Sequence, residues 1–326
     1  MEVYSHIRTP IILFVVIFAA LTSLALGCKV GFYQATCPRA ESIVQSVVKS
    51  AIRSNPTYAP GILRLFFHDC FVNGCDASVL LDGSTSEQTA STNSHLRGFE
   101  VISTAKARVE TECPGVVSCA DILALAARDS VVKTGLPRWE VPTGRRDGLV
   151  SRAEDALKLP GSRDSAEVQI EKFAAKGLNI EELVTLVGGH TIGTSACARF
   201  VHRLYNYSNT NAPDPHIDQA FLPHLQTLCP EHGDRTIRVD LDTGSVNNFD
   251  TSYYENLRKG RGVLESDTKL WTHHITQNLV QQFISVGRPN QLTFSKKFAR
   301  AMVKLSQVEV KTGNEGEIRR VCNRIN

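Results

Sequence analysis

Apolar side chains recur at helical spacing along most of the chain. Between residues 39 and 53 one face carries Ile43, Val44, Val47, Val48, Ala51 and Ile52, the periodicity of an amphipathic helix. The same spacing predicts helices over residues 60–72, 97–112, 118–132, 165–176, 180–187, 194–205, 219–228, 251–259, 276–285 and 295–305. Strand patterns are few and short. We therefore expect an all-α protein of roughly ten helices.

Polar and helix-breaking residues predict where the long loops lie. A polar segment spans residues 82–95, and Pro137, Pro142 and Gly144 interrupt residues 135–159, so both segments are expected to be loops. Asn179 precedes the helix expected at 180–187, and Glu182 follows it by three residues. This spacing predicts a capping box at the start of that helix.

The N-terminal residues differ from the rest of the chain. Arg8 precedes an apolar run over residues 11–21, and Ala25 and Gly27 place small residues at −3 and −1 of a cleavage after Gly27. This arrangement predicts a signal peptide over residues 1–27. A transmembrane anchor is the alternative, but the apolar run is short and polar sequence resumes at once. Residues 28–326 are then expected to form a single domain.

Composition narrows the class of partner. The chain has 36 Lys and Arg against 33 Asp and Glu, a net charge of +3, and 42% hydrophobic residues, enough for a large core. The charges are scattered rather than grouped, which argues against a nucleic-acid partner. After residue 30 no run of 18 apolar residues occurs, so a membrane-spanning domain is not expected. A small molecule is the expected partner.

Nine cysteines in a chain expected to be exported suggest disulfides. Eight of them can pair in an oxidising compartment: Cys37, Cys70, Cys75, Cys113, Cys119, Cys197, Cys229 and Cys322. Spacing alone favours only one pair, Cys70 with Cys75, because the Asn73-Gly74 turn between them brings the two residues close. Cys28, beside the expected cleavage point, is left over.

The densest cluster of chemically active side chains lies in the segment 64–78. If this segment begins in a helix, Arg64, Phe67 and His68 share one face at i, i+3 and i+4. A single histidine among apolar residues is more often part of a core. An arginine on the same apolar stripe favours a functional site, because burying a guanidinium group is costly.

A second histidine follows two glycines. Gly188 and Gly189 allow a backbone or a flat ligand to approach closely, and His190 offers a ring nitrogen to a metal. Zinc bound by His68 and His190 is one possibility, but zinc requires three or four convergent ligands and the cysteines are expected to be in disulfides. A planar iron cofactor held by one histidine, with the other free for chemistry, fits better.

Two loops rich in oxygen ligands accompany these histidines. The first has Asp69, Asp76 and Ser78 with the carbonyls of Val72 and Gly74, and the second has Thr191, Asp242, Ser245, Asn248 and Asp250. Both sets suit a hard cation such as calcium. Neither matches the EF-hand pattern, so from spacing alone solvated acidic loops remain the alternative.

Five strings together resemble the secreted plant (class III) haem peroxidases. They are RLFFHDCFVNGCDAS from Arg64, VSCADIL from Val117, GRRD from Gly144, LVGGHTIG from Leu186 and GEIRRVC from Gly316. They occur in the family's order, and the resemblance runs from about residue 31 to the C-terminus. It implies the haem peroxidase fold, with haem b between a distal and a proximal half, and oxidation of phenolic donors by H2O2.

The resemblance implies a role for each distal residue. His68 would act as base and then acid toward peroxide, and Arg64 would stabilise the charge that develops as the O–O bond breaks. Asn93 matches the residue that accepts a hydrogen bond from the other ring nitrogen of His68, with Glu87 behind it. Thr92 departs from the proline that often precedes this asparagine.

The resemblance also assigns residues around the cofactor. His190 would be the axial ligand of the haem iron, and Asp267 would accept the hydrogen bond from its other ring nitrogen. Phe67 would shield the reactive face of the haem, and Pro160 matches a proline at the donor entrance.

The remaining implications concern disulfides and cations. The cysteines would pair as Cys37–Cys113, Cys70–Cys75, Cys119–Cys322 and Cys197–Cys229. Asp121 and Arg145 match a buried ion pair. The first oxygen-rich loop would bind a distal Ca²⁺ and the second a proximal Ca²⁺, although Ser245-Val246 replaces the family's Thr-Pro pair. Asn206-Tyr207-Ser208 is a sequon for one N-glycan.

Together these implications predict a monomeric peroxidase of the apoplast or cell wall that acts on H2O2 and small phenolic donors. A non-catalytic, disulfide-rich secreted binding protein on the same fold is the main alternative, but it would be expected to lose Arg64, His68 or His190, and all three are present. A zinc hydrolase is a second alternative. The sequence does not identify the physiological donor.

Overall fold

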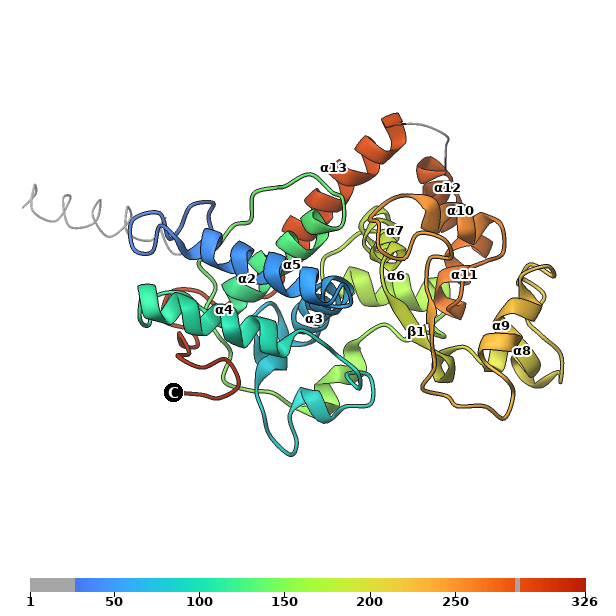
Figure 1. The fold of residues 1–326 in the computed structure, drawn as a ribbon, viewed down its shortest axis with the longest axis horizontal. Helices are drawn as coiled ribbons and strands as arrows, with labels where there is room; N and C mark the ends of the chain where they lie inside the picture. Colours follow the sequence, from blue (N-terminus) through green and yellow to red (C-terminus); the bar gives the residue numbers. More distant parts are fainter. Residues whose placement is uncertain (1–26, 285–287) are drawn as a thin grey trace, which may run out of the picture.

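The computed structural model describes residues 27–284 and 288–326. The expected signal peptide, apart from Gly27, lies outside the described residues and stays a prediction. Within the described part the chain forms twelve α-helices, short 3-10 turns and one two-stranded sheet (Figure 1). The expected all-α class is confirmed, with somewhat more helices than the roughly ten expected.

Four helices pack together in the distal half of the molecule. They are α2 (Ala40–Ser54), α3 (Tyr58–Asn73), α4 (Phe99–Glu112) and α5 (Cys119–Lys133). Helix α5 contacts the other three, and almost all of its residues are buried. Its first turn is capped by Ser118, whose Oγ accepts a hydrogen bond from the backbone N–H of Asp121, a typical N-cap contact. Short 3-10 turns follow α3 or lie in the long loops: η1 (Ser78–Leu80), η2 (Glu87–Thr89) and η3 (Ala153–Lys158).

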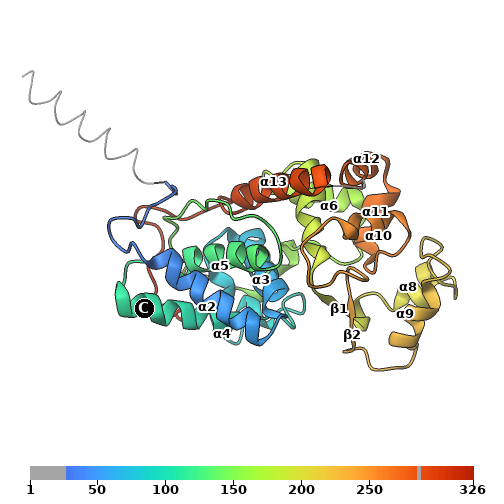
Figure 2. The same ribbon diagram turned by 45° about the horizontal axis from the view of Figure 1, so that its top comes forward.

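The proximal half is a second group of helices. It comprises α6 (Ala166–Ala175), α7 (Ile180–Val187), the 3-10 turn η4 (Gly188–Thr191), α10 (Ser252–Arg258), α11 (Glu265–Thr272), α12 (His274–Phe283) and α13 (Arg288–Leu305). The expected capping box of Asn179 and Glu182 is confirmed at the start of α7. Helix α13 contacts α7 and α12 and reaches from this group toward the distal helices (Figure 2).

A smaller lobe with its own core follows η4. It holds β1 (Thr194–Ala196), η5 (Cys197–Arg199), α8 (His202–Tyr205), η6 (Tyr207–Asn209), α9 (Leu222–Leu228) and β2 (Arg238–Asp240). The strands are antiparallel, with Ser195 opposite Val239. Apolar residues of α8, α9 and β2 form a core separate from the main one.

One expected helix is wrong in its first half. Residues 194–205 were expected to be helical, but Thr194 to Ala196 form a strand and only His202–Tyr205 form an α-helix. Gly193, at φ +95°, turns the chain out of η4, and the pairing of β1 with β2 takes up the backbone groups that a helix would have used. Tertiary pairing has overridden the local helical spacing.

Other boundaries differ less. Helix α3 begins at Tyr58, two residues before Pro60, and a proline in the first turn needs no hydrogen-bond donor. Helix α13 begins at Arg288 rather than near 295. Helix α11 was not expected, and η3 lies within the segment expected to be loop.

Covalent and ionic links join distant segments. The four disulfides have the pairing that the family resemblance implied, and Cys28 is free. Arg145 Nη1 lies 2.6 Å from Asp121 Oδ1 with both side chains fully buried, and Asp121 also accepts a hydrogen bond from the Tyr33 hydroxyl. Among the described helices, none is long and apolar enough to cross a membrane.

Candidate active site

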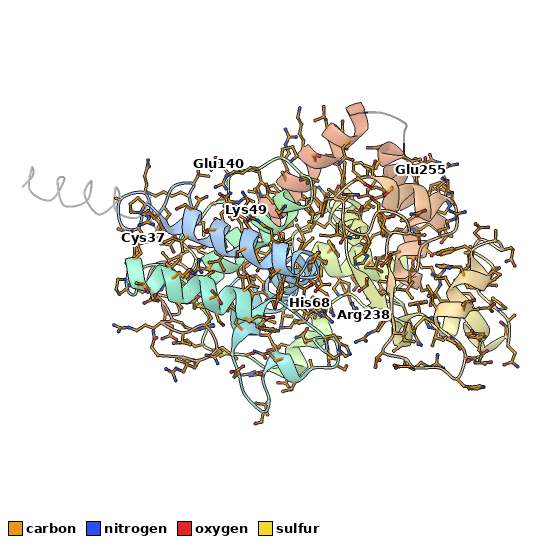
Figure 3. All side chains as sticks on the ribbon, viewed as in Figure 1. Cys37, Lys49, His68, Glu140, Arg238 and Glu255 are labelled. Carbon is orange, nitrogen blue, oxygen red and sulfur yellow. A yellow bond between two sulfur atoms is a disulfide. The ribbon has the colours of Figure 1, made fainter. Side chains whose placement is uncertain are left out.

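A cavity of about 550 Å³ separates the distal and proximal halves. Its walls include Leu63 and Phe67 of α3, Leu186 of α7, and both candidate histidines, His68 and His190. Pro160, the expected donor-entrance residue, also lines it. The volume lies within the range of cofactor pockets. Figure 3 shows His68 near the centre of the molecule, where the two halves meet.

A chain of hydrogen bonds fixes His68. Its Nδ1 lies 2.6 Å from Asn93 Oδ1, and Asn93 Nδ2 donates to the backbone carbonyl of Glu87 at 2.7 Å. Because Asn93 Oδ1 can only accept, the network assigns the proton to Nδ1 and leaves a lone pair on Nε2. Glu87 supports Asn93 through its carbonyl, while its carboxyl group accepts from Ser151 Oγ at 3.4 Å.

Arg64 donates a hydrogen bond to the unprotonated nitrogen of His68. One helical turn before His68 on α3, its Nε is 3.2 Å from His68 Nε2, and its Nη2 donates to the carbonyl of Thr92 at 2.9 Å. Burial, then the charges of Arg199 and Arg238, lowers the pKa of Arg64 to about 10, so it is still charged at neutral pH. Burial and the Arg64 charge lower the pKa of His68 to about 3. His68 is therefore a neutral imidazole that can accept a proton.

Phe67 stands in an aromatic group beside this pair. Its ring centroid lies 4.8 Å from that of Phe71 and 6.0 Å from that of Phe173. Phe71 and Phe173 are buried, and Phe67 and Phe173 line the cavity. The packing fixes Phe67 as an apolar wall beside His68.

His190 is held from behind by a carboxylate. It lies on the turn η4, directly after α7, and its Nδ1 is 3.0 Å from Asp267 Oδ1 on α11. Asp267 is buried and its other oxygen has no hydrogen-bond partner within the described chain. The ring of Tyr253 lies edge-on to His190 at 6.1 Å between centroids. With Nδ1 bonded to Asp267, His190 Nε2 is the nitrogen left to bind a ligand.

Glycine is required two residues before His190, at Gly188. A Cβ on Gly188 would overlap the hydroxyl of Tyr254, which donates to the carbonyl of Val184. Gly189 lines the cavity, and a Cβ there would approach Leu63 on the opposite wall. The first glycine therefore permits helix packing, whereas a side chain at the second would make an ordinary van der Waals contact with Leu63.

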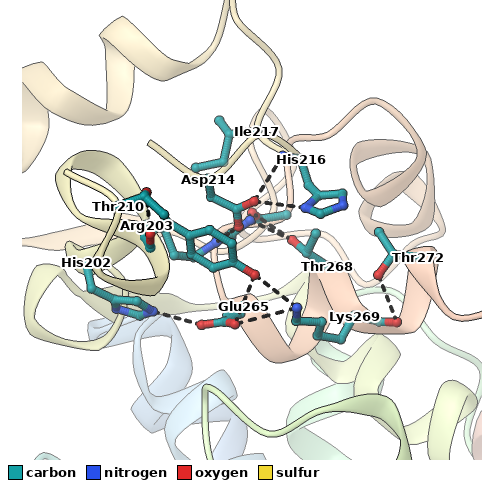
Figure 4. A network of polar contacts seen from close by, with 12 residues as sticks. His202, Arg203, Thr210, Asp214, His216, Ile217, Glu265, Thr268, Lys269 and Thr272 are labelled. Atoms are coloured by element: carbon teal, nitrogen blue, oxygen red, sulfur yellow. Dashed lines mark hydrogen bonds and ion pairs between the residues drawn. The ribbon is translucent and has the colours of Figure 1, made fainter. Parts of the chain in front are cut away.

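Helix α11, which carries Asp267, is tied to the smaller lobe by a polar network (Figure 4). Arg203 donates to Asp214 Oδ2 and to Thr268 Oγ1, both at 2.9 Å. Glu265 lies 2.9 Å from His202 Nε2. These contacts position the helix behind His190. Apolar spacing did not predict α11, because its apolar positions are sparse.

The first oxygen-rich loop folds into a buried cluster. Asp69 Oδ2 accepts from the backbone N–H of Ala77 at 2.9 Å, and Asp76 Oδ1 accepts from that of Ser78 at 3.0 Å. Ser78 Oγ is buried without a hydrogen-bond partner in the described structure. Burial and the nearby charge of Asp76 raise the pKa of Asp69. Two buried carboxylates with an unpaired hydroxyl are a donor set that suits a hard cation.

Carbonyls and lysines complete this distal cluster. The carbonyl of Gly74 accepts from the N–H of Asp76 at 2.8 Å, and that of Val72 accepts from Lys176 Nζ at 3.1 Å. Lys311 Nζ lies 2.5 Å from Asp76 Oδ2. Sequence reasoning had not included the two lysines, which come from distant segments and partly neutralise the cluster.

The second oxygen-rich loop also converges. Thr191 Oγ1 donates to Asp242 Oδ2 at 2.8 Å and lies 3.3 Å from the carbonyl of Asn248, and Ser245 Oγ donates to Asp250 Oδ2 at 2.6 Å. Burial raises the pKa of Asp242.

Sequence reasoning missed Ser252 and Asn256 in this proximal cluster, and Asn256 Nδ2 donates to Asp242 Oδ1 at 2.6 Å. Ser252 Oγ lies 2.7 Å from Asp242 Oδ2 and 2.5 Å from Asp250 Oδ1, so it bridges the two carboxylates. Its place two residues after Asp250 was the available signal. The described residues contain no group of three or more His, Cys, Asp or Glu side chains arranged for a metal, so a cation in either cluster would depend on hydroxyl and carbonyl ligands.

Comparisons with known proteins agree with this geometry. A family model described as Peroxidase matches residues 44–286. The chain is 58% identical to Peroxidase N1 of Nicotiana tabacum over 330 residues, with 100% of both chains covered. It is 57% identical to Peroxidase 71 of Arabidopsis thaliana, covering 92% of this chain and 90% of the relative. With Peroxidase 62 of the same plant the identity is 56%, covering 92% and 93%.

Proposed function

The chain belongs to the class III plant peroxidases, and from that premise we propose that it uses H2O2 to oxidise small phenolic donors outside the cell. Peroxidase activity follows from the family, whose cofactor is haem. The non-catalytic alternative is not favoured. The class of donor, the location and the roles of individual residues are the proposal.

The cavity suits haem on the chemistry of its walls. It is largely apolar and has a histidine on either side, and only His190 is backed by a carboxylate. His190 would hold the iron through Nε2, while Leu63, Phe67 and Leu186 would contact the flat faces of the ring. Haem supplies a redox-active iron that accepts the oxidising equivalents of peroxide.

On the distal side the protein's own residues move the proton. His68 is neutral and has its lone pair on Nε2, so it takes a proton from H2O2 there and returns it to the oxygen that leaves as water. Asn93 keeps the ring in this tautomer. Arg64, 3.2 Å away and charged, stabilises the negative charge that develops as the O–O bond breaks.

On the proximal side Asp267 accepts the Nδ1 proton of His190 in a hydrogen bond. This contact orients the ring and makes it a stronger electron donor to a bound metal. Helix α11 holds Asp267 in place through the network with the smaller lobe.

The two oxygen clusters are proposed to bind one calcium ion each. Asp69 directly follows His68, and Thr191 directly follows His190, so each ion would anchor a catalytic histidine through its neighbour. Buried carboxylates with hydroxyl and carbonyl oxygens around them support this assignment. They are hard ligands of the type that calcium prefers.

The observation that carries the proposal is the pair of histidines on opposite walls, one accepting a hydrogen bond from Arg64 at its unprotonated Nε2 and the other bonded to Asp267. Purified protein should show a haem absorption spectrum and oxidise guaiacol only when H2O2 is present. Protein recovered from extracellular fluid should begin near Cys28. A haem-loaded preparation that oxidises no phenol with H2O2 would contradict the proposed function.

A further inference from the structure

Three arginines outside the catalytic pair line the same cavity. Arg97 immediately precedes the turn into α4, Arg199 lies in η5 and Arg238 in β2. Arg97 and Arg238 are exposed to solvent and Arg199 is half-buried, so they form the mouth of the cavity. Figure 3 shows Arg238 and His68 both in the region where the two halves meet. These three residues are called the arginine rim.

Neutral oxygen atoms hold each guanidinium group of the rim. Arg199 Nη2 donates to the carbonyl of Ser91 at 2.9 Å and to Ser94 Oγ at 3.1 Å. Arg238 Nε donates to Thr194 Oγ1 at 2.7 Å. Arg97 Nη1 donates to Thr57 Oγ1 at 3.3 Å. Each group is therefore oriented, and none of the hydrogen bonds described for it goes to a carboxylate.

The rim has no counter-charge of its own. Within the described structure none of its three arginines lies within 4 Å of a carboxylate, whereas Arg145 and Arg203 lie 2.6 Å and 2.9 Å from carboxylate oxygens. Part of the lowering of the Arg64 pKa comes from Arg199 and Arg238. The positive charges of Arg199 and Arg238 at the cavity mouth therefore act as far as Arg64.

We propose that the arginine rim binds the carboxylate of an anionic aromatic donor, that is, a phenol carrying an acid group. A guanidinium fork pairs with a carboxylate in a bidentate geometry, and an uncompensated positive mouth attracts anions from solution. This inference rests on the proposed function and names the class of donor within it.

Haem itself brings two propionate groups, which also seek cations. Among the described residues, however, the cavity wall holds four guanidinium groups, counting Arg64, and two acids, Asp240 and Asp267. Because Arg97 and Arg238 are exposed to solvent, a donor that binds and dissociates can reach them. The three guanidinium groups of the rim therefore outnumber the two propionates of haem.

The test compares two donors that differ only in charge, 4-hydroxy-3-methoxycinnamic acid and its methyl ester. Binding to the haem-loaded enzyme is measured without peroxide by the change in visible spectrum, and KM is measured with peroxide. The wild type should bind the acid more tightly than the ester, and the preference should shrink as salt rises. Arg199→Gln and Arg238→Gln should each weaken binding of the acid about three- to tenfold and leave the ester unchanged.

Arg261→Gln is the matched control, because Arg261 pairs with Asp218 and does not line the cavity. It should leave the preference unaltered. Equal binding of acid and ester by the wild type would overturn the proposal.

The rate of haem loss to excess apomyoglobin tests whether the rim binds the haem propionates instead of the donor's carboxylate. If the rim variants lose haem faster and keep the wild-type preference for the acid, the rim serves the propionates and the proposal is wrong. The proposed function is tested separately by turnover of the ester and guaiacol. A failure to oxidise either would leave the binding preference for the acid intact.

Discussion

The two histidines that face the cavity are fixed by partners of different charge. His68 is held by a neutral amide, Asn93, at 2.6 Å, and His190 by a carboxylate, Asp267, at 3.0 Å. The neutral partner orients His68 without adding charge, so the ring can gain and lose a proton. The carboxylate strengthens His190 as a metal ligand. The same side chain is thus directed to two tasks by its neighbour.

The oxygen clusters beside the two histidines differ in a related way. In the distal cluster Lys311 contacts Asp76 directly. In the proximal cluster Asp242 and Asp250 are bridged by the hydroxyl of Ser252. The distal carboxylates are paired with a lysine, whereas the proximal ones are hydrogen-bonded only to neutral donors in the described structure. Loss of an ion should therefore lower stability and peroxidase rate more on the proximal side.

The largest expected effect is on the proximal side. His190→Ala removes the only nitrogen that Asp267 supports, so the variant should lose the native haem spectrum and its turnover of guaiacol together. Absorption spectra and haem content after gel filtration provide the measurement. Retention of the wild-type spectrum and rate would show that His190 does not bind the iron.

Substitutions on the distal side should lower the rate of reaction with peroxide and leave the haem content unchanged. His68→Ala should slow the step that consumes peroxide by roughly 10²–10⁴-fold, the usual contribution of acid–base catalysis, while haem stays bound. Arg64→Ala should slow it less, because Arg64 stabilises charge but transfers no proton. Stopped-flow spectra after mixing with peroxide report this step. Small and equal losses in both variants would contradict the acid–base role of His68.

Local signals predicted the parts of the fold that local interactions determine. The capping box of Asn179 and Glu182 and the bounds of α7 are confirmed, because both depend on residues a few positions apart. The strand at Thr194 was missed because its pairing partner lies over forty residues later. Helix α11 was missed because few apolar residues mark it, and tertiary contacts such as that of Arg203 with Thr268 hold it in place.

The candidate site shows the same division. The family strings carried His68, His190 and the residues next to them. The family strings did not predict the arginine rim or Lys311, because these residues reach the site through the packing of separate segments. Single residues at scattered positions become a site only when the fold brings them together. Their spacing along the chain does not predict this proximity.

The smallest expected effect concerns calcium, and it tests the difference between the two clusters. Removing an ion leaves paired carboxylates that repel each other, Asp69 with Asp76 and Asp242 with Asp250, and loosens the residue next to a catalytic histidine. Exhaustive EGTA treatment should lower Tm by several degrees, as expected for the loss of about 3 kcal/mol of binding energy. It should also lower the peroxidase rate, and added Ca²⁺ should restore both.

Variants separate the two sides. Elemental analysis of untreated protein should find about two calcium ions per haem, the count expected if each cluster binds one ion. Asp250→Asn should lose the proximal ion and reproduce most of the EGTA effect, since no lysine compensates there. Asp76→Asn should have a milder effect, because its partner Lys311 stays in the cluster. Asp234→Asn is the control, since Asp234 lies in an exposed turn outside both clusters and its described hydrogen bonds are to Thr236. An active preparation without calcium, whose melting EGTA does not change, would mean that both clusters are solvated acidic loops.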